Sequence, residues 1–172
     1  MAELSLVPED LLMRKRLRQQ TSCPKVWTLL DTVTDPEIPV ISIWDLGILQ
    51  DVSDQDNTVR VVITPTYSGC PAMREIESDI RKVLARAGYN QIEVLTRLSP
   101  AWSTDWMSED GKKKLMDFGI APPTMLGQKR QVICPQCRSS NTTLISEFGS
   151  TACKALYKCD DCLEAFDYFK CI

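Results

Sequence analysis

Cys134-Pro135-Gln136-Cys137 and Cys159-Asp160-Asp161-Cys162 are the two stretches that decide the fold of the C-terminal part of this chain. Each Cys-x-x-Cys pair can present two thiolates to one metal ion from a tight turn. Two such pairs joined by a short β-rich segment make a tetrahedral four-sulfur site. We therefore predict a zinc ribbon in which Cys134, Cys137, Cys159 and Cys162 are the zinc ligands. Iron suits the same four ligands, and the spacing does not separate the two metals.

The residues around the two pairs bear on this prediction. The chain has no histidine, so a soft-metal site must consist of cysteines or use carboxylates. Arg138 stands where many ribbons place a glycine to ease the turn, which departs from the usual pattern. The alternatives are a pair of disulfides or four unrelated thiols. Eight cysteines without a secretion signal at the N-terminus favour metal chemistry in a reducing compartment, and we expect a cytoplasmic protein.

Length and charge exclude several classes. A chain of 172 residues suits one domain with a small appendage. A net charge of -3 gives no basic field for nucleic acid, and no apolar run is long enough to span a membrane. Residues 1–22 are expected to be a flexible leader. The alternative is a short amphipathic helix around Leu11 and Leu17, whose basic residues could touch a membrane or a partner.

Residues 23–120 predict an α+β domain, with a small mixed sheet and helices on one face. Helices are expected over residues 24–34, 71–87 and 109–118, and strands over residues 47–52, 58–64 and 92–98. Residues 121–130 are predicted to be a linker. Residues 131–172 are predicted to form the small β zinc-ribbon domain.

Thr64-Pro65-Thr66-Tyr67-Ser68-Gly69-Cys70-Pro71 carries the second chemical feature. A strand leads through a turn into a helix with proline at its first position, which places Cys70 at the helix N-terminus. Unpaired N–H groups there favour the thiolate, so we expect a lowered pKa for Cys70. Gly69 is expected to allow a tight bend, while Thr66 and Ser68 add hydroxyl groups. The alternative is that Cys70 is a small, packed thiol.

Three acidic residues are candidates for the same site. Asp35, Glu37 and Asp45 lie in loops marked by proline and glycine, where positioned polar groups often gather. Asp35 can equally cap a turn. Without histidine the chain has no Ser–His–Asp or Cys–His arrangement, and it contains no phosphate-binding or dinucleotide-binding glycine motif. These residues favour an assembly or binding role over catalysis.

Several of these segments resemble known families. Asp35-Pro36-Glu37-Ile38-Pro39-Val40, Asp45-Leu46-Gly47-Ile48 and the segment 64–71 resemble the SufT-like iron–sulfur assembly domain. Residues 102–107 and 118–120 strengthen that match. The tail, over residues 146–157 and 166–172, is similar to the PaaD family, the D components encoded with the bacterial 1,2-phenylacetyl-CoA epoxidase of phenylacetate degradation. The resemblance covers residues 23–172.

The resemblance implies a compact α/β unit associated with iron–sulfur maturation, with Cys70 as its characteristic cysteine and a transient cluster or iron bound there. It implies two partners, the oxygenase and its flavin- and [2Fe–2S]-carrying reductase. The chain would be an accessory or maturation factor, not catalytic on its own. The alternatives are a docking subunit that bridges oxygenase and reductase, or a true redox subunit. The oligomeric state stays open, a homodimer included.

Four further residues have open roles. Cys153 and Cys171 are left over from the two pairs, and each is either a metal-handling thiol or a buried one. Trp102 and Trp106 are either aromatic anchors for a partner or covers for the open end of the sheet.

Overall fold

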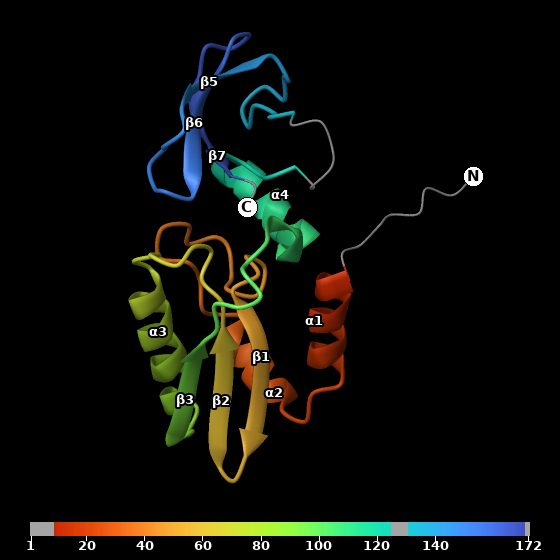
Figure 1. The fold of residues 1–172 in the computed structure, drawn as a ribbon, viewed down its shortest axis with the longest axis vertical. Helices are drawn as coiled ribbons and strands as arrows, with labels where there is room; N and C mark the ends of the chain where they lie inside the picture. The colour runs from red at the N-terminus through yellow and green to blue at the C-terminus, as the bar shows by residue number, and fades with distance from the viewer. Residues whose placement is uncertain (1–8, 125–130, 171–172) are drawn as a thin grey trace, which may run out of the picture.

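The computed structural model describes residues 9–124 and 131–170, which form an N-terminal layered part and a C-terminal β ribbon (Figure 1). The helices are α1 (Glu9–Gln19), α2 (Pro24–Leu30), α3 (Met73–Arg86) and α4 (Glu109–Phe118), with a short 3-10 turn, η1 (Thr104–Trp106). The strands are β1 (Leu49–Gln55), β2 (Thr58–Ile63), β3 (Gln91–Thr96), β4 (Ile120–Ala121), β5 (Thr142–Ser146), β6 (Lys154–Cys159) and β7 (Ala165–Phe169). Among the described residues, no helix is long and apolar enough to cross a bilayer.

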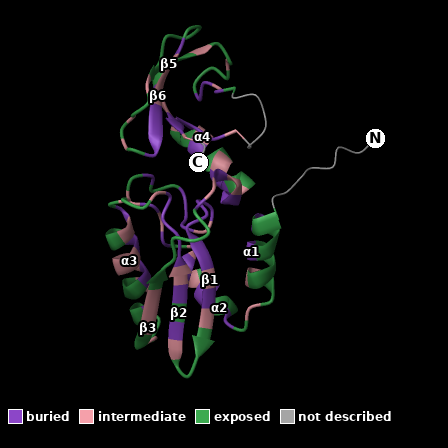
Figure 2. Ribbon diagram, in the orientation of Figure 1, coloured by how far each residue is buried: buried purple, intermediate pink, exposed green. Residues whose placement is uncertain are grey.

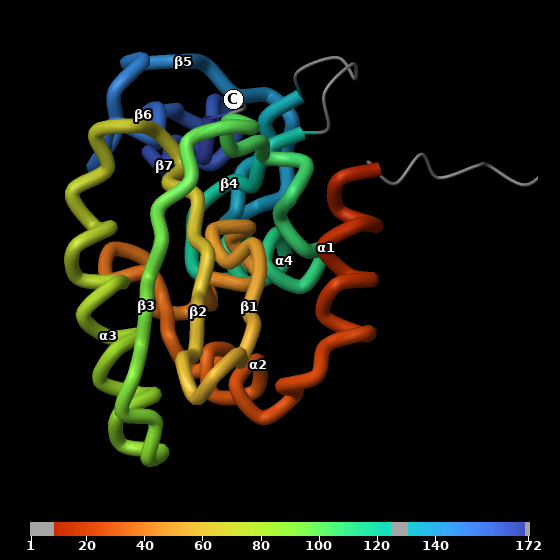
Figure 3. Tube along the Cα trace, turned by 60° about the horizontal axis from the view of Figure 1, so that its bottom comes forward, coloured from red at the N-terminus to blue at the C-terminus, as the bar shows by residue number. Residues whose placement is uncertain are grey.

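The N-terminal sheet has the order β1-β2-β3, in which β1 pairs antiparallel and β3 parallel with the central strand β2. Side chains alternate along β2, so that Val59, Val61 and Ile63 are buried while Arg60 is exposed. Helices α2 and α3 cover the buried face (Figure 3). The prediction of an α+β domain with a mixed sheet and helices on one face is confirmed.

Local sequence explains the element boundaries. Helix α3 buries a stripe formed by Ile76, Ile80 and Leu84, as its spacing predicts. The turn between the first two strands is shorter than the gap between the expected ranges, 47–52 and 58–64. Strand β1 continues to Gln55, and only Asp56 and Asn57 make the turn, both with positive φ. Aspartate and asparagine tolerate this left-handed conformation, which the tight hairpin requires.

Helix α1 differs from the flexible leader that we expected over residues 1–22. Residues Glu9–Gln19 form a helix beside β1, whereas residues 1–8 lie outside the described part of the chain. The reason is Arg14, which is 4% exposed and donates to the carbonyl oxygens of Trp106 at 2.6 Å and Leu49 at 2.8 Å. Its guanidinium also lies over the ring of Trp44, 4.5 Å from the centroid. One basic residue of this segment, Arg14, therefore attaches the helix to the rest of the domain.

The ribbon sheet has the order β4-β7-β6-β5. This sheet starts earlier in the chain than predicted, because Ile120 and Ala121 pair with β7. We expected residue 120 to end the first domain and residue 121 to begin a linker. The ribbon lies over the loops at the end of the first sheet, where β2 and β3 end (Figure 1). Figure 2 shows buried residues in those loops as well as in the strands. Cys153 and Phe169 from the ribbon belong to the core of the N-terminal part.

Candidate metal centre and thiol site

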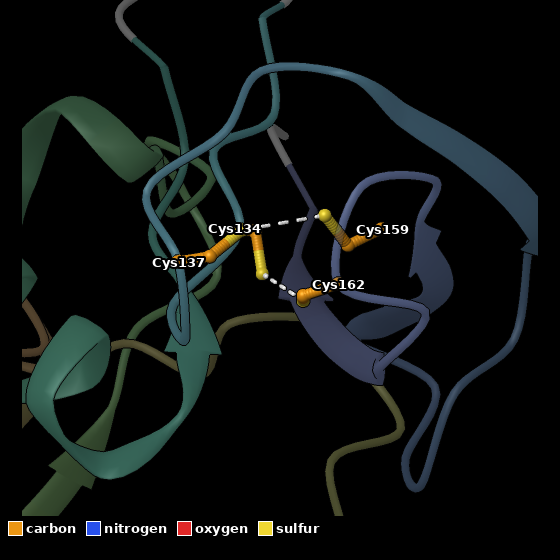
Figure 4. Close-up of side chains that lie close together, drawn as sticks. All are labelled: Cys134, Cys137, Cys159 and Cys162. Atoms are coloured by element: carbon orange, nitrogen blue, oxygen red, sulfur yellow. Dashed lines mark hydrogen bonds between the residues drawn. The ribbon is translucent and has the colours of Figure 1, made fainter.

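Four thiols from the two Cys-x-x-Cys pairs meet in the ribbon (Figure 4). The sulfur atoms of Cys134, Cys137, Cys159 and Cys162 all lie within 4.8 Å of one another. Two of the sulfur–sulfur distances are 3.7 Å, between Cys134 and Cys162, and 3.5 Å, between Cys137 and Cys159. Four sulfurs at tetrahedral positions about 2.3 Å from a zinc ion are about 3.8 Å apart. The thiols therefore have the spacing that a tetrahedral metal ion requires.

Two matching turns produce this geometry. The N–H of Arg138 donates to the carbonyl of Cys134 at 2.9 Å, and the N–H of Leu163 donates to the carbonyl of Cys159 at 3.0 Å. Arg138 and Leu163 both have left-handed backbone, with φ of 65° and 66°. Such a conformation costs a residue with a side chain about 1–2 kcal/mol. Arg138 therefore departs from the glycine pattern in residue type but still makes the turn.

The electrostatics of the four thiols favour a bound cation. The backbone N–H groups of Cys162 and Asp161 stabilise the Cys159 thiolate and lower its pKa to about 7. The N–H of Glu164 also favours the Cys162 thiolate, but burial and the neighbouring thiols outweigh it and raise the pKa of Cys162 to about 12. Adjacent thiolates repel one another, so they do not all form without a positive charge between them. A divalent metal ion supplies that charge. The described cysteines form no disulfide.

Cys70 lies in the loop between β2 and α3 and is partly exposed. Helix α3 begins at Met73, so Cys70 does not open the helix as we predicted. The predicted lowering of its pKa is wrong. Burial raises the pKa of the Cys70 thiol, and hydrogen bonds from the N–H of Ala72 and the hydroxyl of Thr66 offset only part of that effect.

Two of the three candidate acids lie near Cys70. After burial, the negative charges of Asp35 and Glu37 contribute to the raised pKa of the Cys70 thiol, so both carboxylates are within electrostatic range of it. Asp35 also caps its own turn, because its Oδ1 accepts the N–H groups of Glu37 at 2.8 Å and Ile38 at 2.9 Å. The two interpretations of Asp35 are thus compatible.

Asp45 makes its contacts in a different part of the domain, at helix α4. Its carboxylate accepts hydrogen bonds from the Ser108 hydroxyl and the Lys114 ammonium, both at 2.6 Å. Ser108 in turn caps α4 by accepting the N–H of Gly111, a role that serine commonly takes directly before a helix. Asp45 therefore joins α4 to the loop before β1, and its described hydrogen-bond partners do not include the Cys70 loop.

The remaining candidates around Cys70 have unequal roles. The Thr66 hydroxyl is a hydrogen-bond donor to the Cys70 sulfur. Ser68 lines a cleft of about 260 Å³ together with Leu98 and Trp102. Gly69 does not have a positive φ, and an added Cβ would sit 3.7 Å from the Tyr67 ring. The backbone conformation at this position is therefore open to other residues, and the small side of Gly69 leaves the approach to the loop open.

The two tryptophans are buried rather than exposed for a partner. Trp102 and Trp106 are each 3% exposed. The indole N–H of Trp102 donates to the carbonyl of Leu46 at 3.1 Å, and its ring lies 5.9 Å from that of Phe169. Their burial favours the alternative of a packing role and contradicts the interpretation as exposed anchors for a partner.

Sequence reasoning missed the surroundings of Cys153. This thiol is buried in the same core that Cys70 and Tyr67 pack against, at the contact between ribbon and first domain. Lys154 follows it and is 4% exposed, with its charge near both Asp35 and Cys153. Only tertiary packing brings these residues together, and the sequence separation gave no signal for it. Cys171, the other leftover thiol, lies outside the described residues.

Comparison with protein families assigns both parts of the chain. Residues 24–95 match the family described as iron–sulfur cluster assembly protein. Residues 120–170 match the PaaD zinc beta ribbon domain. Fold and thiol geometry together thus define an iron–sulfur assembly domain joined to a four-cysteine zinc ribbon.

Three relatives agree with this class. The putative D component of the 1,2-phenylacetyl-CoA epoxidase of Escherichia coli is 48% identical over 152 residues, covering 86% of this chain and 92% of the relative. The Fe-S protein maturation auxiliary factor of Porphyromonas gingivalis is 38% identical over 51% of this chain and 84% of its own length. The crystal structure of a domain of unknown function, DUF59, from Bacillus anthracis is 32% identical, with a TM-score of 0.50, over 60% of this chain and 95% of that one. The chain belongs to the PaaD family, the D components of the phenylacetyl-CoA epoxidase, and the resemblance seen in the sequence is confirmed.

Proposed function

We propose that this chain is a non-catalytic maturation factor of the phenylacetyl-CoA epoxidase system, which uses Cys70 to hold iron, alone or in an iron–sulfur cluster, for the oxygenase or its reductase. One observation carries the proposal. Cys70 is a partly exposed thiol in a domain of the iron–sulfur assembly family. The Thr66 hydroxyl donates a hydrogen bond to it, and the carboxylates of Asp35 and Glu37 lie within electrostatic range of its sulfur. Thiolates are the usual ligands of iron–sulfur clusters.

The ribbon has a separate, structural role in this proposal. Cys134, Cys137, Cys159 and Cys162 hold one zinc ion, whose binding energy folds the small C-terminal part. Two buried cysteines and two exposed ones make up the set. The alternative metal, iron, has the same ligands. Elemental analysis of chain purified without chelator tests this assignment, with one zinc per chain as the expected result.

The two thiol sites differ in the number of sulfur ligands that they offer. In the ribbon, four thiols converge and can hold one metal ion between them, which suits a structural role. Burial raises the pKa of Cys70, so a metal must displace a proton that the thiol retains at neutral pH. Competition with protons weakens metal binding, and weak binding favours release. Free thiols of this kind need the reducing conditions of the cytoplasm, which is where we place the chain.

Exchange of the Cys70 thiol tests the proposal. Cys70→Ser keeps the size of the side chain and removes the soft ligand. In cells that express the whole epoxidase pathway, we expect Cys70→Ser to abolish epoxidation while zinc content and thermal stability stay as in the wild type. Cys23→Ser is the matched control, because it alters a buried thiol that donates to the carbonyl of Val52, away from this loop. Wild-type epoxidation with Cys70→Ser would overturn the proposal.

A second candidate, a docking subunit that bridges oxygenase and reductase, has one observation in its favour. The face of the sheet opposite α2 and α3 carries Leu95, and the chain after it carries Leu98, which are 39% and 60% exposed. Exposed apolar residues near a cleft are typical of protein contacts. Docking predicts stable co-purification with both components and unchanged epoxidation with Cys70→Ser. The same cell assay therefore separates the two functions.

A further inference from the structure

Asp161 links the two Cys-x-x-Cys turns of the ribbon. It lies inside the second turn, between Cys159 and Cys162. Its carboxylate accepts a hydrogen bond from the hydroxyl of Ser139 and another from the side-chain amide of Asn141, the latter at 2.8 Å. Ser139 and Asn141 belong to the segment that follows the first turn. One carboxylate therefore ties the second turn to the chain that leaves the first.

Ser139 and Asp161 also hold ligand sulfurs through their backbones. The N–H of Ser139 donates to the sulfur of Cys137, and the N–H of Asp161 donates to the sulfur of Cys159. The hydrogen bond between their side chains thus joins two residues that each orient a thiol, one from each turn. Partners of this kind, which contact the ligands rather than the metal, orient the ligands and contribute to metal affinity.

Backbone hydrogen bonds fix the positions of the two donors. The N–H of Asp160 donates to the carbonyl of Asn141 at 2.9 Å, and the N–H of Cys134 donates to the carbonyl of Ser139 at 2.8 Å. The Ser139 hydroxyl also accepts the N–H of Asn141 at 3.0 Å. The carboxylate of Asp161 therefore meets two donors that are already placed with respect to both turns.

A link between the turns matters because half of the metal site is open to solvent. Cys134 and Cys159 are buried, whereas Cys137 and Cys162, one from each turn, are exposed. A chelator in solution can reach a metal ion beside exposed sulfur ligands, and the ion leaves when the two turns separate. A hydrogen-bonded link opposes that separation without covering the sulfurs.

We propose that Asp161 is a positioning residue that holds the two turns together and so slows the release of the metal ion from the ribbon. The inference rests on the proposed structural role of the ribbon and deepens it, because it explains how a half-exposed four-thiol site keeps its ion instead of passing it on. Asp161 does not touch the ion. It acts through Ser139 and Asn141 and through the N–H groups at the sulfurs.

Asp160 offers a matched control in the same turn. Both aspartates are exposed, and each stands next to one metal ligand in the sequence, so each adds a negative charge close to the ion. The carboxylate of Asp160, however, accepts the hydroxyl of Thr143 on β5, at 2.5 Å. Asp160→Ala therefore removes the same charge and one hydrogen bond but leaves the side-chain link between the two turns intact.

Release of zinc from the full chain tests the inference. Zinc-loaded protein is mixed with an excess of a chromogenic chelator, and the rate of zinc release is followed by absorbance. We expect Asp161→Ala to release zinc at least about tenfold faster than wild type, since outer partners of metal ligands contribute 10- to 100-fold to affinity. Ser139→Ala should speed release by a smaller factor, because Asn141 still donates to the carboxylate. Asp160→Ala should release zinc at the wild-type rate.

Two further variants separate the link from a general structural effect. Ser139→Ala should speed release in the wild-type chain but not in a chain that already carries Asp161→Ala, because the two side chains act through one shared hydrogen bond. Asp161→Asn keeps one acceptor oxygen, so its rate should lie between those of wild type and Asp161→Ala. Loss of zinc from Asp161→Ala during purification, with full zinc in Asp160→Ala, would support the same conclusion.

The results that would overturn the inference are distinct from those that decide the proposed function. A wild-type release rate in Asp161→Ala, equal acceleration by Asp160→Ala, or multiplied effects in the double variant would each overturn it and leave zinc in the ribbon. A wild-type chain that contains no metal would overturn the structural role of the ribbon as well. The cell assay with Cys70→Ser decides the maturation function independently of both.

Discussion

Loss of one ribbon ligand should unfold the ribbon and open the region around Cys70. Cys137→Ser is the change of choice, because Cys137 is exposed and its replacement leaves no cavity. Structural zinc contributes about 10–16 kcal/mol to the folding of small zinc modules. That matches or exceeds the roughly 5–15 kcal/mol by which whole domains are stable. The few large buried side chains of the ribbon, such as Phe166 and Tyr168, offer little to replace it.

The effect should reach the first domain. Phe169 is 1% exposed and packs beside Trp102, so unfolding of the ribbon uncovers that indole to water. We expect Cys137→Ser to contain no zinc, to lose the thermal transition of the ribbon, and to show red-shifted tryptophan fluorescence. Wild-type zinc content together with an unchanged melting curve in Cys137→Ser would refute this reasoning. Cys23→Ser is again the control for the loss of a thiol as such.

Two smaller changes test local parts of the structure. Burial raises the pKa of the Asp45 carboxyl group. The hydrogen bonds from Lys114, Ser108 and Ser42, together with the charge of Lys114, outweigh this effect and hold the pKa below its usual range. Asp45→Asn should therefore lower the free energy of unfolding by about 1–3 kcal/mol above pH 4. The difference from wild type should vanish as the pH falls through the lowered pKa, and urea titrations at several pH values would show a constant difference if the reasoning is wrong. Leu163→Gly should stabilise the ribbon by about 0.5 kcal/mol, because relief of the left-handed conformation exceeds the entropic cost of glycine. Since Leu163 is 68% exposed, little burial is lost, and a lower melting temperature would contradict the expectation.

Much of the fold follows from local sequence. The stripe of α3, the Ser108 cap with Gly119 ending α4, and the paired cysteines of the ribbon are short-range signals that the structure reproduces. The docking of α1 could not be predicted, because it depends on the burial of Arg14 against carbonyl groups far away in the chain. An arginine-rich segment predicts an exposed element rather than a docked helix, because charged side chains are rarely buried in a protein.

The candidate site was predictable only in part, for the same reason. Cys70, Asp35 and Glu37 stand in recognisable loop motifs, and the structure brings them into range of one another. The sign of the Cys70 pKa shift was wrong because burial, a tertiary effect, exceeds the influence of the helix end that the sequence suggested. Cys153 carries no local signal for its place in the N-terminal core, since only the packing of the ribbon on the first domain puts it there.

Reconstitution of phenylacetyl-CoA epoxidation tests the central claim, maturation rather than turnover, most directly. Oxygenase and reductase are purified from cells that contain the whole pathway, and epoxidation is measured with and without this chain. A maturation factor has completed its work by then, so we expect equal rates in both samples. Components purified from cells that lack the chain should be inactive when mixed. A rate that rises in proportion to added chain, with components that are already mature, would contradict the account and make this protein a working component of the epoxidase.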